Sequence, residues 1–370
     1  MEQQPFVATG DKVACRCSDH VVFGSATQYT TVALNSMDAP VKASAFDNGG
    51  PAPVHVAKSF ARSFVVTDSH TGKPLAHRAY VAVVDGQRKE GSTDTLGMVF
   101  IKAPAADSVI ELHVMSQAPY RDFPIGERGG KAFTTKATAT EMSPGQTLTP
   151  VSITVNDRAA TREAISQELR SMGATFIERS FWGALKAKPG MAMDWDYSMI
   201  ALHHGGRSFA CTPGGVKQML DIQKNHMDKK FDDIGYHYGI ACDGTILEGR
   251  DIRLQASSVK LFNKGVIGIV LLENLTTAEE GDDLVAKGRE TLELFGHNTT
   301  NVIAPPQIDA LLSLIIVLKS LFVIKRLGGH REFPGQERDG KICPGNVGMD
   351  LVKNIRAKTQ LLPPPRMDTE

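Results

Sequence analysis

The first part of the chain has the alternation of apolar and polar residues that is typical of β-strands. From residue 59, short runs rich in β-branched and aromatic residues, such as SFVVTD and AYVAVVDG, are separated by Gly, Asp and Pro turns. Runs of this length with a period of two predict half-buried antiparallel strands. We therefore expect a small all-β sandwich domain over residues 59–156, with a loop at 126–148. Residues 1–58 have no clear period and are expected to form a separate leader region.

After residue 157 the pattern changes to alternating helices and strands. The segment PGGVKQMLDIQKNHMDK places Met219 and Ile222 on one apolar face, which predicts a helix that packs on a core. The runs MIALH and VIGIVLL contain no polar interruption, as expected for strands that are covered on both faces. This alternation predicts an α/β domain over residues 157–362, followed by a tail at 363–370.

Composition excludes some classes of function. Lys plus Arg and Asp plus Glu number 41 each, so the formal net charge is zero and no basic surface for nucleic acid is indicated. The longest apolar segment, ALLSLIIVLKSLFVI, is interrupted by Lys319 and is too short to span a bilayer. The first residues, MEQQPFVATGDK, lack the basic and apolar regions of a signal peptide. We therefore expect synthesis in the cytoplasm without a signal peptide, and no membrane span.

Three residues of the α/β domain have the placement expected of metal ligands. His203 ends a predicted strand, His330 follows RLGG, and Cys343 lies in the turn KICPGN. Two imidazoles and one thiolate form a ligand set that catalytic zinc uses, with a fourth position open. Taken singly, each residue is more often a satisfied core or loop residue, so spacing alone leaves both interpretations open.

The other cysteines favour different roles. Cys15, Cys17 and His20 form a second possible cluster, but three ligands within six residues do not easily enclose a tetrahedral ion. Cys211 and Cys242 are expected to be buried free thiols. With five scattered cysteines, the sequence predicts no disulfide scaffold and favours folding in a reducing compartment.

The α/β domain resembles the type-2 N-acetylmuramoyl-L-alanine amidases, a family that includes the peptidoglycan recognition proteins. The matching motifs occur in order across the domain: RSFWGA, IALHHGG, DIGYHYGIACDGTILEGRD, NKGVIGIVLLEN, GGHRE and CPG. The resemblance implies a mixed central β-sheet flanked by helices and a peptidoglycan substrate. It also implies Zn²⁺ as cofactor, held by His203, His330 and Cys343, with His204 as a structural or rim residue.

Two further positions match catalytic residues of the family. Tyr236 in IGYHY falls where the family has a catalytic tyrosine, and Lys341 falls where the phage enzymes have a catalytic lysine. Without the resemblance, Tyr236 would be a core tyrosine and Lys341 a solvated loop lysine. The sequence departs from the family at Ser258, where a histidine is common, and at Val266, which replaces a serine. These departures put the contacts of the substrate groove in doubt, but they leave the zinc ligands unchanged.

The β-rich region resembles small modules that precede toxin domains in type VI secretion effectors. The pattern is TDSHTGKPL, then a tyrosine, then DG, then GSTDTLG, and the opening segment faintly resembles part of a spike-tip PAAR module. This resemblance implies an antibacterial effector that acts in the periplasm of a target cell, with a secretion spike protein and an immunity protein as partners. Two alternatives remain open: a peptidoglycan-binding module that does not cleave, and a phage endolysin or tail-associated amidase.

Overall fold

In the computed structural model the described residues form two compact units: one from the residues up to 116 with those from 123 to 157, and one from residues 117–122 with those from 158 on. The residues that it describes are 58–123, 132–143, 145–206, 208–212, 214–280, 284–336 and 340–365. The expected leader region and its weak PAAR likeness therefore lie outside the described residues, as do Cys15, Cys17 and His20.

The first unit is built from two four-stranded sheets, so the expected small all-β sandwich is confirmed. One sheet has the order β4-β1-β7, with β8 pairing in parallel with β1, and the other has the order β3-β2-β5-β6. The strands are β1 (Ser59–Asp68), β2 (Ala79–Val84), β3 (Gln87–Ser92), β4 (Met98–Ala103), β5 (Val109–Met115), β6 (Ala132–Thr138), β7 (Thr140–Met142) and β8 (Val151–Val155).

The expectation of a loop at 126–148 is wrong for residues 132–142, which form β6 and β7. The segment AFTTKATATEM is rich in β-branched threonine but carries few large apolar residues. The strand is stabilised by pairing with a neighbour, because β6 lies antiparallel to β5 along its full length and buries Phe133. Tertiary pairing thus decides the structure of a segment with a weak local signal.

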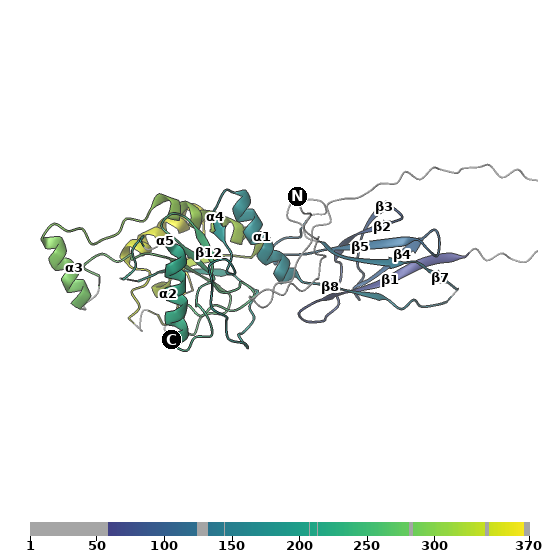
Figure 1. Cartoon of the computed structure of the whole chain (residues 1–370), viewed down its shortest axis with the longest axis horizontal. Coiled ribbons are helices and arrows are strands. Elements are labelled where there is room, and N and C mark those ends of the chain that lie inside the picture. Colours follow the sequence, from purple (N-terminus) through teal and green to yellow (C-terminus); the bar gives the residue numbers. More distant parts are fainter. Residues whose placement is uncertain are drawn as a thin grey trace, which may run out of the picture. The chain divides into compact units, whose positions relative to one another are not determined.

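The second unit contains a six-stranded mixed sheet with helices on both sides, as expected (Figure 1). The strand order is β14-β10-β13-β11-β12-β9, and all neighbours are parallel except the hairpin of β11 and β12. The strands are β9 (Phe176–Ile177), β10 (Met199–His204), β11 (Tyr238–Ile240), β12 (Ile246–Glu248), β13 (Val266–Leu271) and β14 (Arg326–Gly329). The central strand β13 is buried at all six positions, which explains its uninterrupted apolar sequence.

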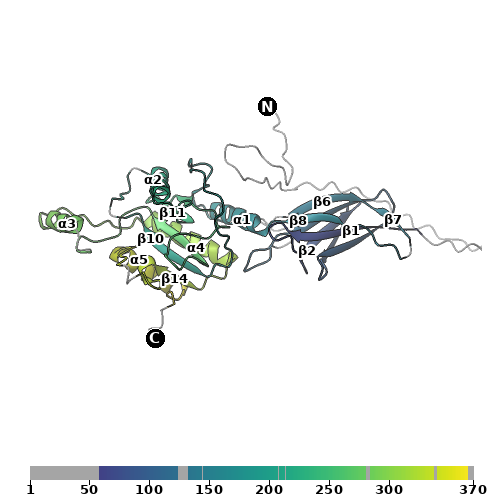
Figure 2. The same cartoon turned by 90° about the horizontal axis from the view of Figure 1, so that it is seen from below.

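Helices cover both faces of this sheet. Helix α2 lies on one side, whereas α4 and α5 lie on the other (Figure 2). The helices are α1 (Asp157–Ser171), α2 (Gly215–Asp228), α3 (Leu284–Leu294), α4 (Pro305–Leu321) and α5 (Asn346–Thr359). Met219 and Ile222 of α2 pack in the core cluster with Leu247 and Val270, so the predicted apolar face is the buried one. Among the described residues, no helix has the length and hydropathy needed to cross a bilayer.

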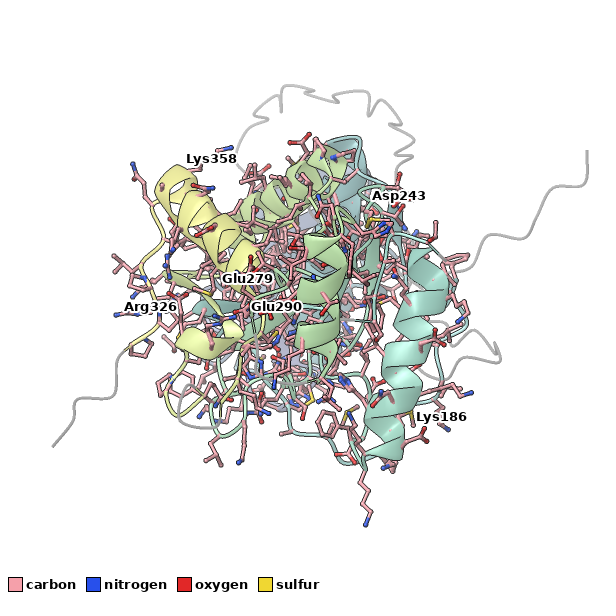
Figure 3. The ribbon with its side chains drawn as sticks, turned by 90° about the vertical axis from the view of Figure 1, so that its left-hand side faces the viewer. Lys186, Asp243, Glu279, Glu290, Arg326 and Lys358 are labelled. Carbon is pink, nitrogen blue, oxygen red and sulfur yellow. A yellow bond between two sulfur atoms is a disulfide. The ribbon has the colours of Figure 1, made fainter. Side chains whose placement is uncertain are left out.

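Helix α3 belongs to the long connection between β13 and α4. Ala286 is its only buried residue among those described, and polar residues such as Glu290 lie on its surface (Figure 3). The helix is tied to the connection on both sides of it, because the Arg289 guanidinium donates hydrogen bonds to Thr276 and Thr299. The insertion therefore adds surface to the unit without enlarging its core.

Candidate metal centre

His203, His330 and Cys343 meet at one edge of the mixed sheet. His203 lies at the end of β10, and His330 begins a short 3₁₀-helix (His330–Glu332) directly after the neighbouring strand β14. Because β10 and β14 are parallel, their carboxyl ends share one edge of the sheet, where sites in α/β sheets usually lie. Cys343 lies in the turn before α5. One ligand atom from each of the three residues lies within 4.8 Å of the others.

The spacing of these atoms fits a tetrahedral zinc ion. The Cys343 Sγ is 3.6 Å from His203 Nδ1, and the ring centroids of His203 and His330 are 4.6 Å apart. Zinc with bonds of ~2.0–2.3 Å separates its nitrogen and sulfur ligands by about 3.5 Å. The three side chains therefore need only small adjustments to share one ion.

Two glycines allow the approach of the chain segments that carry these residues. A Cβ on Gly329 would lie 2.7 Å from Pro344 Cδ and 2.4 Å from Met349 Sδ. Gly345 has a φ of 87°, and a Cβ there would lie 2.1 Å from the carbonyl oxygen of Leu275. A larger side chain at Gly329 would push the turn that contains Cys343 away from β14, and one at Gly345 would push it away from Leu275.

The protonation states of the two imidazoles suit a metal. Burial lowers the pKa of His203 well below its usual value and lowers that of His330 to about 4, so both rings are neutral at physiological pH. His203 Nε2 is buried and has no hydrogen-bond partner among the described residues. Burial raises the pKa of the Cys343 thiol to about 12, so the thiol is protonated when no metal is bound. A bound cation would displace this proton and leave a thiolate ligand.

Gln336 orients His330 and was not identified from the sequence. Its Oε1 lies 3.1 Å from His330 Nε2, which directs the Nδ1 lone pair of the ring toward the other two ligands. The amide nitrogen of Gln336 donates to the carbonyl oxygen of Lys260, so the side chain is held at both ends. Gln336 is 2% exposed. A glutamine in a Gly/Pro-rich loop carries no sequence signal for this role.

The two candidate catalytic residues have different surroundings. The Tyr236 ring lies 4.8 Å from that of His203, and burial raises the pKa of its phenol, so the hydroxyl remains a donor at neutral pH. Lys341 is exposed; its positive charge adds to the effect of burial in lowering the pKa of His330, and it offsets part of the rise that burial causes in the pKa of Cys343. His204 is buried and accepts a hydrogen bond from the backbone N–H of Leu275, as expected for a structural residue.

A cleft of ≈ 480 Å³ adjoins Tyr236. One wall is the segment after β10, including Phe209, and the other is the polar face of α2 with Asp221 and Asn225. His226 also lines the cleft, with its ring 5.4 Å from that of Tyr236. Tyr236 therefore lies between His203 and this cleft.

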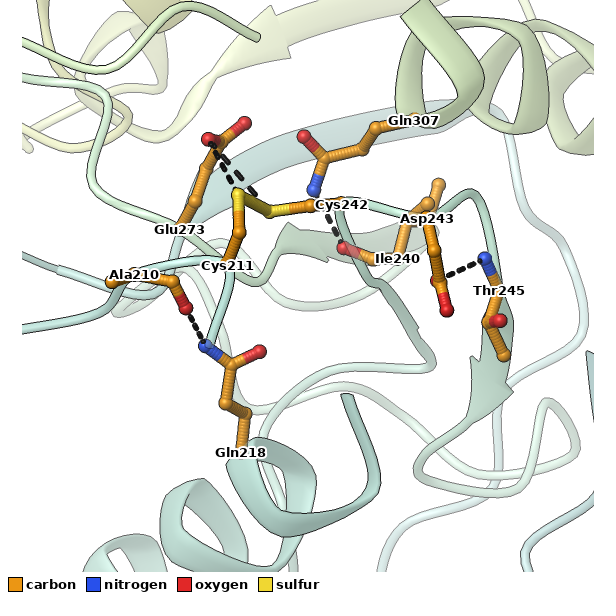
Figure 4. The surroundings of a disulfide bond; sticks show 9 residues. All are labelled: Ala210, Cys211, Gln218, Ile240, Cys242, Asp243, Thr245, Glu273 and Gln307. Carbon is orange, nitrogen blue, oxygen red and sulfur yellow. Dashed lines mark hydrogen bonds between the residues drawn. A yellow bond between two sulfur atoms is a disulfide. The ribbon is translucent and has the colours of Figure 1, made fainter. Parts of the chain in front are cut away.

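The expectation that Cys211 and Cys242 are buried free thiols is wrong, because they form a disulfide (Figure 4). Cys211 is exposed on the segment after β10, and Cys242 is partly buried in the hairpin turn after β11. Both strands run parallel to β13, so their carboxyl ends share one edge of the sheet. This placement brings together two cysteines that are 31 residues apart, and it removes an argument for folding in a reducing compartment.

Comparison with known proteins identifies relatives of part of the chain. No family model matches the chain. It is 32% identical over 107 residues to peptidoglycan-recognition protein LB of Drosophila melanogaster, covering 28% of this chain and 46% of that protein. It is 31% identical over 154 residues to human peptidoglycan recognition protein 3, covering 37% of this chain and 45% of that protein. The chain thus spans about half the length of these curated relatives.

Solved structures of similar proteins cover about half of the chain. The structure of Drosophila PGRP-LB has a TM-score of 0.39 and 26% identity, covering 51% of this chain and 96% of that chain. The N-acetylmuramoyl-L-alanine amidase LysC from Clostridium intestinale has a TM-score of 0.37 and 21% identity, covering 50% of this chain and 98% of that chain.

Proposed function

We propose that this protein is a zinc-dependent amidase that cleaves the bond between N-acetylmuramic acid and L-alanine in peptidoglycan. The observation that carries the proposal is the convergence of His203, His330 and Cys343 beside Tyr236, a residue that lines a cleft. Two neutral imidazoles and one thiolate leave a fourth position of a zinc ion open, as hydrolytic sites require. The similarity to proteins named for peptidoglycan recognition supports this substrate.

The protein's own residues supply the rest of the chemistry. Bound by the three ligands, zinc would lower the pKa of a water molecule and polarise the amide carbonyl. In this proposal the protonated Tyr236 hydroxyl would donate a hydrogen bond to the oxygen that gains negative charge, and the Lys341 ammonium would add positive charge. The cleft beside Tyr236 gives the substrate a place to bind along α2.

The alternative is recognition of peptidoglycan without cleavage. A complete ligand set together with Tyr236 and Lys341 favours cleavage, because binding alone has no use for an open metal position. A phage endolysin or tail-associated amidase would share the same site and would differ only in how it reaches the cell wall.

The biological setting that we propose is that of an antibacterial effector. The N-terminal region would then serve delivery by a type VI secretion spike, and the α/β domain would act on peptidoglycan in the periplasm of the target cell. A cognate immunity protein would protect the producing cell. The support for this setting is the sequence resemblance of residues 64–104 to effector modules.

Digestion of purified sacculi tests the activity. The wild-type chain should bind one zinc ion at this centre and release stem peptides with a free L-alanine amino group, measured by mass spectrometry. His330→Ala and Cys343→Ser should lose both zinc and activity, whereas His297→Ala, a matched change at an exposed histidine, should keep both. Equal zinc content in Cys343→Ser and wild type would contradict the ligand assignment, and intact amide bonds would contradict the reaction.

A further inference from the structure

A second group of potential metal ligands lies apart from His203, His330 and Cys343. The Oε2 atom of Glu273 is 3.9 Å from the sulfur of Cys211 and 3.9 Å from that of Cys242 (Figure 4). Glu273 follows β13, so all three residues lie beyond the carboxyl ends of neighbouring parallel strands. The three ligand atoms lie within 4.8 Å of one another.

Glu273 is poorly satisfied next to a disulfide. Its side chain is 0% exposed, and its Oε1 has no hydrogen-bond partner among the described residues. Its Oε2 faces only the two sulfurs, and the sulfurs of a disulfide carry no hydrogen to donate. A buried carboxyl without a donor or a cation is costly, so native structures usually provide one.

Gln307 supplies a second buried oxygen for which the described residues offer no hydrogen-bond donor. Gln307, in the first turn of α4, points toward this group in Figure 4. Its nitrogen donates to the carbonyl oxygen of Ile240, whereas its Oε1 is buried without a partner among the described residues. Two sulfurs, one carboxyl and one amide oxygen therefore lie in one region as electron-pair donors. What would complement such a group is a positive ion.

We propose that reduction of the Cys211–Cys242 disulfide creates a second metal site, in which both thiolates and Glu273 bind a divalent cation of the zinc class. Thiolate with carboxylate is a ligand set that zinc accepts. The sulfur-to-oxygen distance of 3.9 Å is close to the ~3.5 Å separation of such ligands around one ion. The sulfurs must move apart to about 3.8 Å, and the exposed position of Cys211 permits this movement.

The exchange between the two states is balanced. A dithiol or a trialkylphosphine supplies two electrons and the sulfur–sulfur bond breaks; the reductant becomes a disulfide, or a phosphine oxide with oxygen from water. Each sulfur gains one proton, and the cation displaces both protons when it binds. The chain thus holds either the disulfide or the second cation, and the state depends on the redox conditions.

Cobalt substitution tests this site without interference from the other cysteines. The full chain with Cys15, Cys17 and Cys343 replaced by serine retains only Cys211 and Cys242 as sulfur ligands. After reduction with a water-soluble phosphine, Co²⁺ should bind and give the near-ultraviolet charge-transfer band of a cobalt thiolate, with one equivalent at saturation. The oxidised form of the same chain should give no band.

Three variants separate binding at this site from loose binding to free thiols. Loss of even an outer partner weakens metal sites by about 10–100-fold, so Glu273→Gln should weaken cobalt binding at least tenfold. Glu279→Gln, a change at an exposed acid, should leave the affinity unchanged. Cys242→Ser should abolish the band, and circular dichroism of the oxidised and reduced chains verifies the fold.

Two results would overturn the proposal. One is a folded, reduced chain that gives no band with Co²⁺, and the other is a Glu273→Gln variant that binds as tightly as its parent. The measurement uses a chain without Cys343 and requires no turnover, so it is independent of the proposed amidase function. Failure of either proposal leaves the other intact.

Discussion

Replacing Gln336 by methionine tests whether a residue outside the ligand set controls zinc affinity. The change keeps the volume of the side chain but removes the oxygen that lies 3.1 Å from His330 Nε2. Because Gln336 is 2% exposed, water cannot readily take the place of that oxygen. His330 would lose both its fixed orientation and its partner.

The expected loss follows from the position of this contact. Outer partners of metal-binding histidines are worth about 10–100-fold in affinity, or roughly 1.4–2.7 kcal/mol. Since the His330–Gln336 contact is shielded from solvent, we expect a loss in the upper half of that range. Gln336→Glu retains an acceptor oxygen near the ring and should bind zinc far better than Gln336→Met.

Competition with a chromophoric chelator measures the zinc affinity of each full-length variant. Gln167→Met, at an exposed glutamine of α1, is the matched control and should bind zinc as the wild type does. Thermal unfolding of the metal-free proteins separates loss of affinity from loss of fold. A folded Gln336→Met variant with zinc affinity within about twofold of wild type would refute the role assigned to this contact.

Three further predictions address chemistry, stability and delivery. Tyr236→Phe and Lys341→Ala should each retain zinc yet lower turnover of sacculi by about a hundredfold, because both residues act on the transition state. Turnover at the wild-type rate would show that neither residue takes part in catalysis. Arg162→Met should lower the free energy of unfolding, measured with urea, by about 3–5 kcal/mol, because it leaves the Glu248 carboxylate buried without its bidentate partner; a loss below 1 kcal/mol would show that the pair is dispensable. Full-length protein in the cytoplasm should be nearly harmless, whereas full-length protein and residues 157–370 exported to the periplasm should both cause lysis; equal killing from the cytoplasm would contradict peptidoglycan as the target.

The elements that the sequence predicted well are those with a strong local pattern. The continuous apolar run of β13 indicated a strand covered on both faces, and MIALH indicated a strand that ends at His203, whereas the strand before His330 was not predicted. The residues that were missed depend on contacts between distant segments. Gln336 acts only because its loop folds back on His330, and nothing in the local sequence of Glu273 distinguishes it from a surface acid. The pairing of two parallel strands with β13 could have indicated the disulfide, had both cysteines been assigned to the same edge.

The disulfide has a further consequence for how the protein responds to proteases. The 31-residue separation between its cysteines encloses all of α2 and β11, and with them one wall of the cleft. Closing a loop of that length removes about 4 kcal/mol of chain entropy from the unfolded state in the loop-closure account. A cut at any bond within the loop would break the backbone but would not release a fragment, since both new ends remain tied through sulfur. An oxidised chain nicked between these cysteines would thus run as one species without reductant and as two with it.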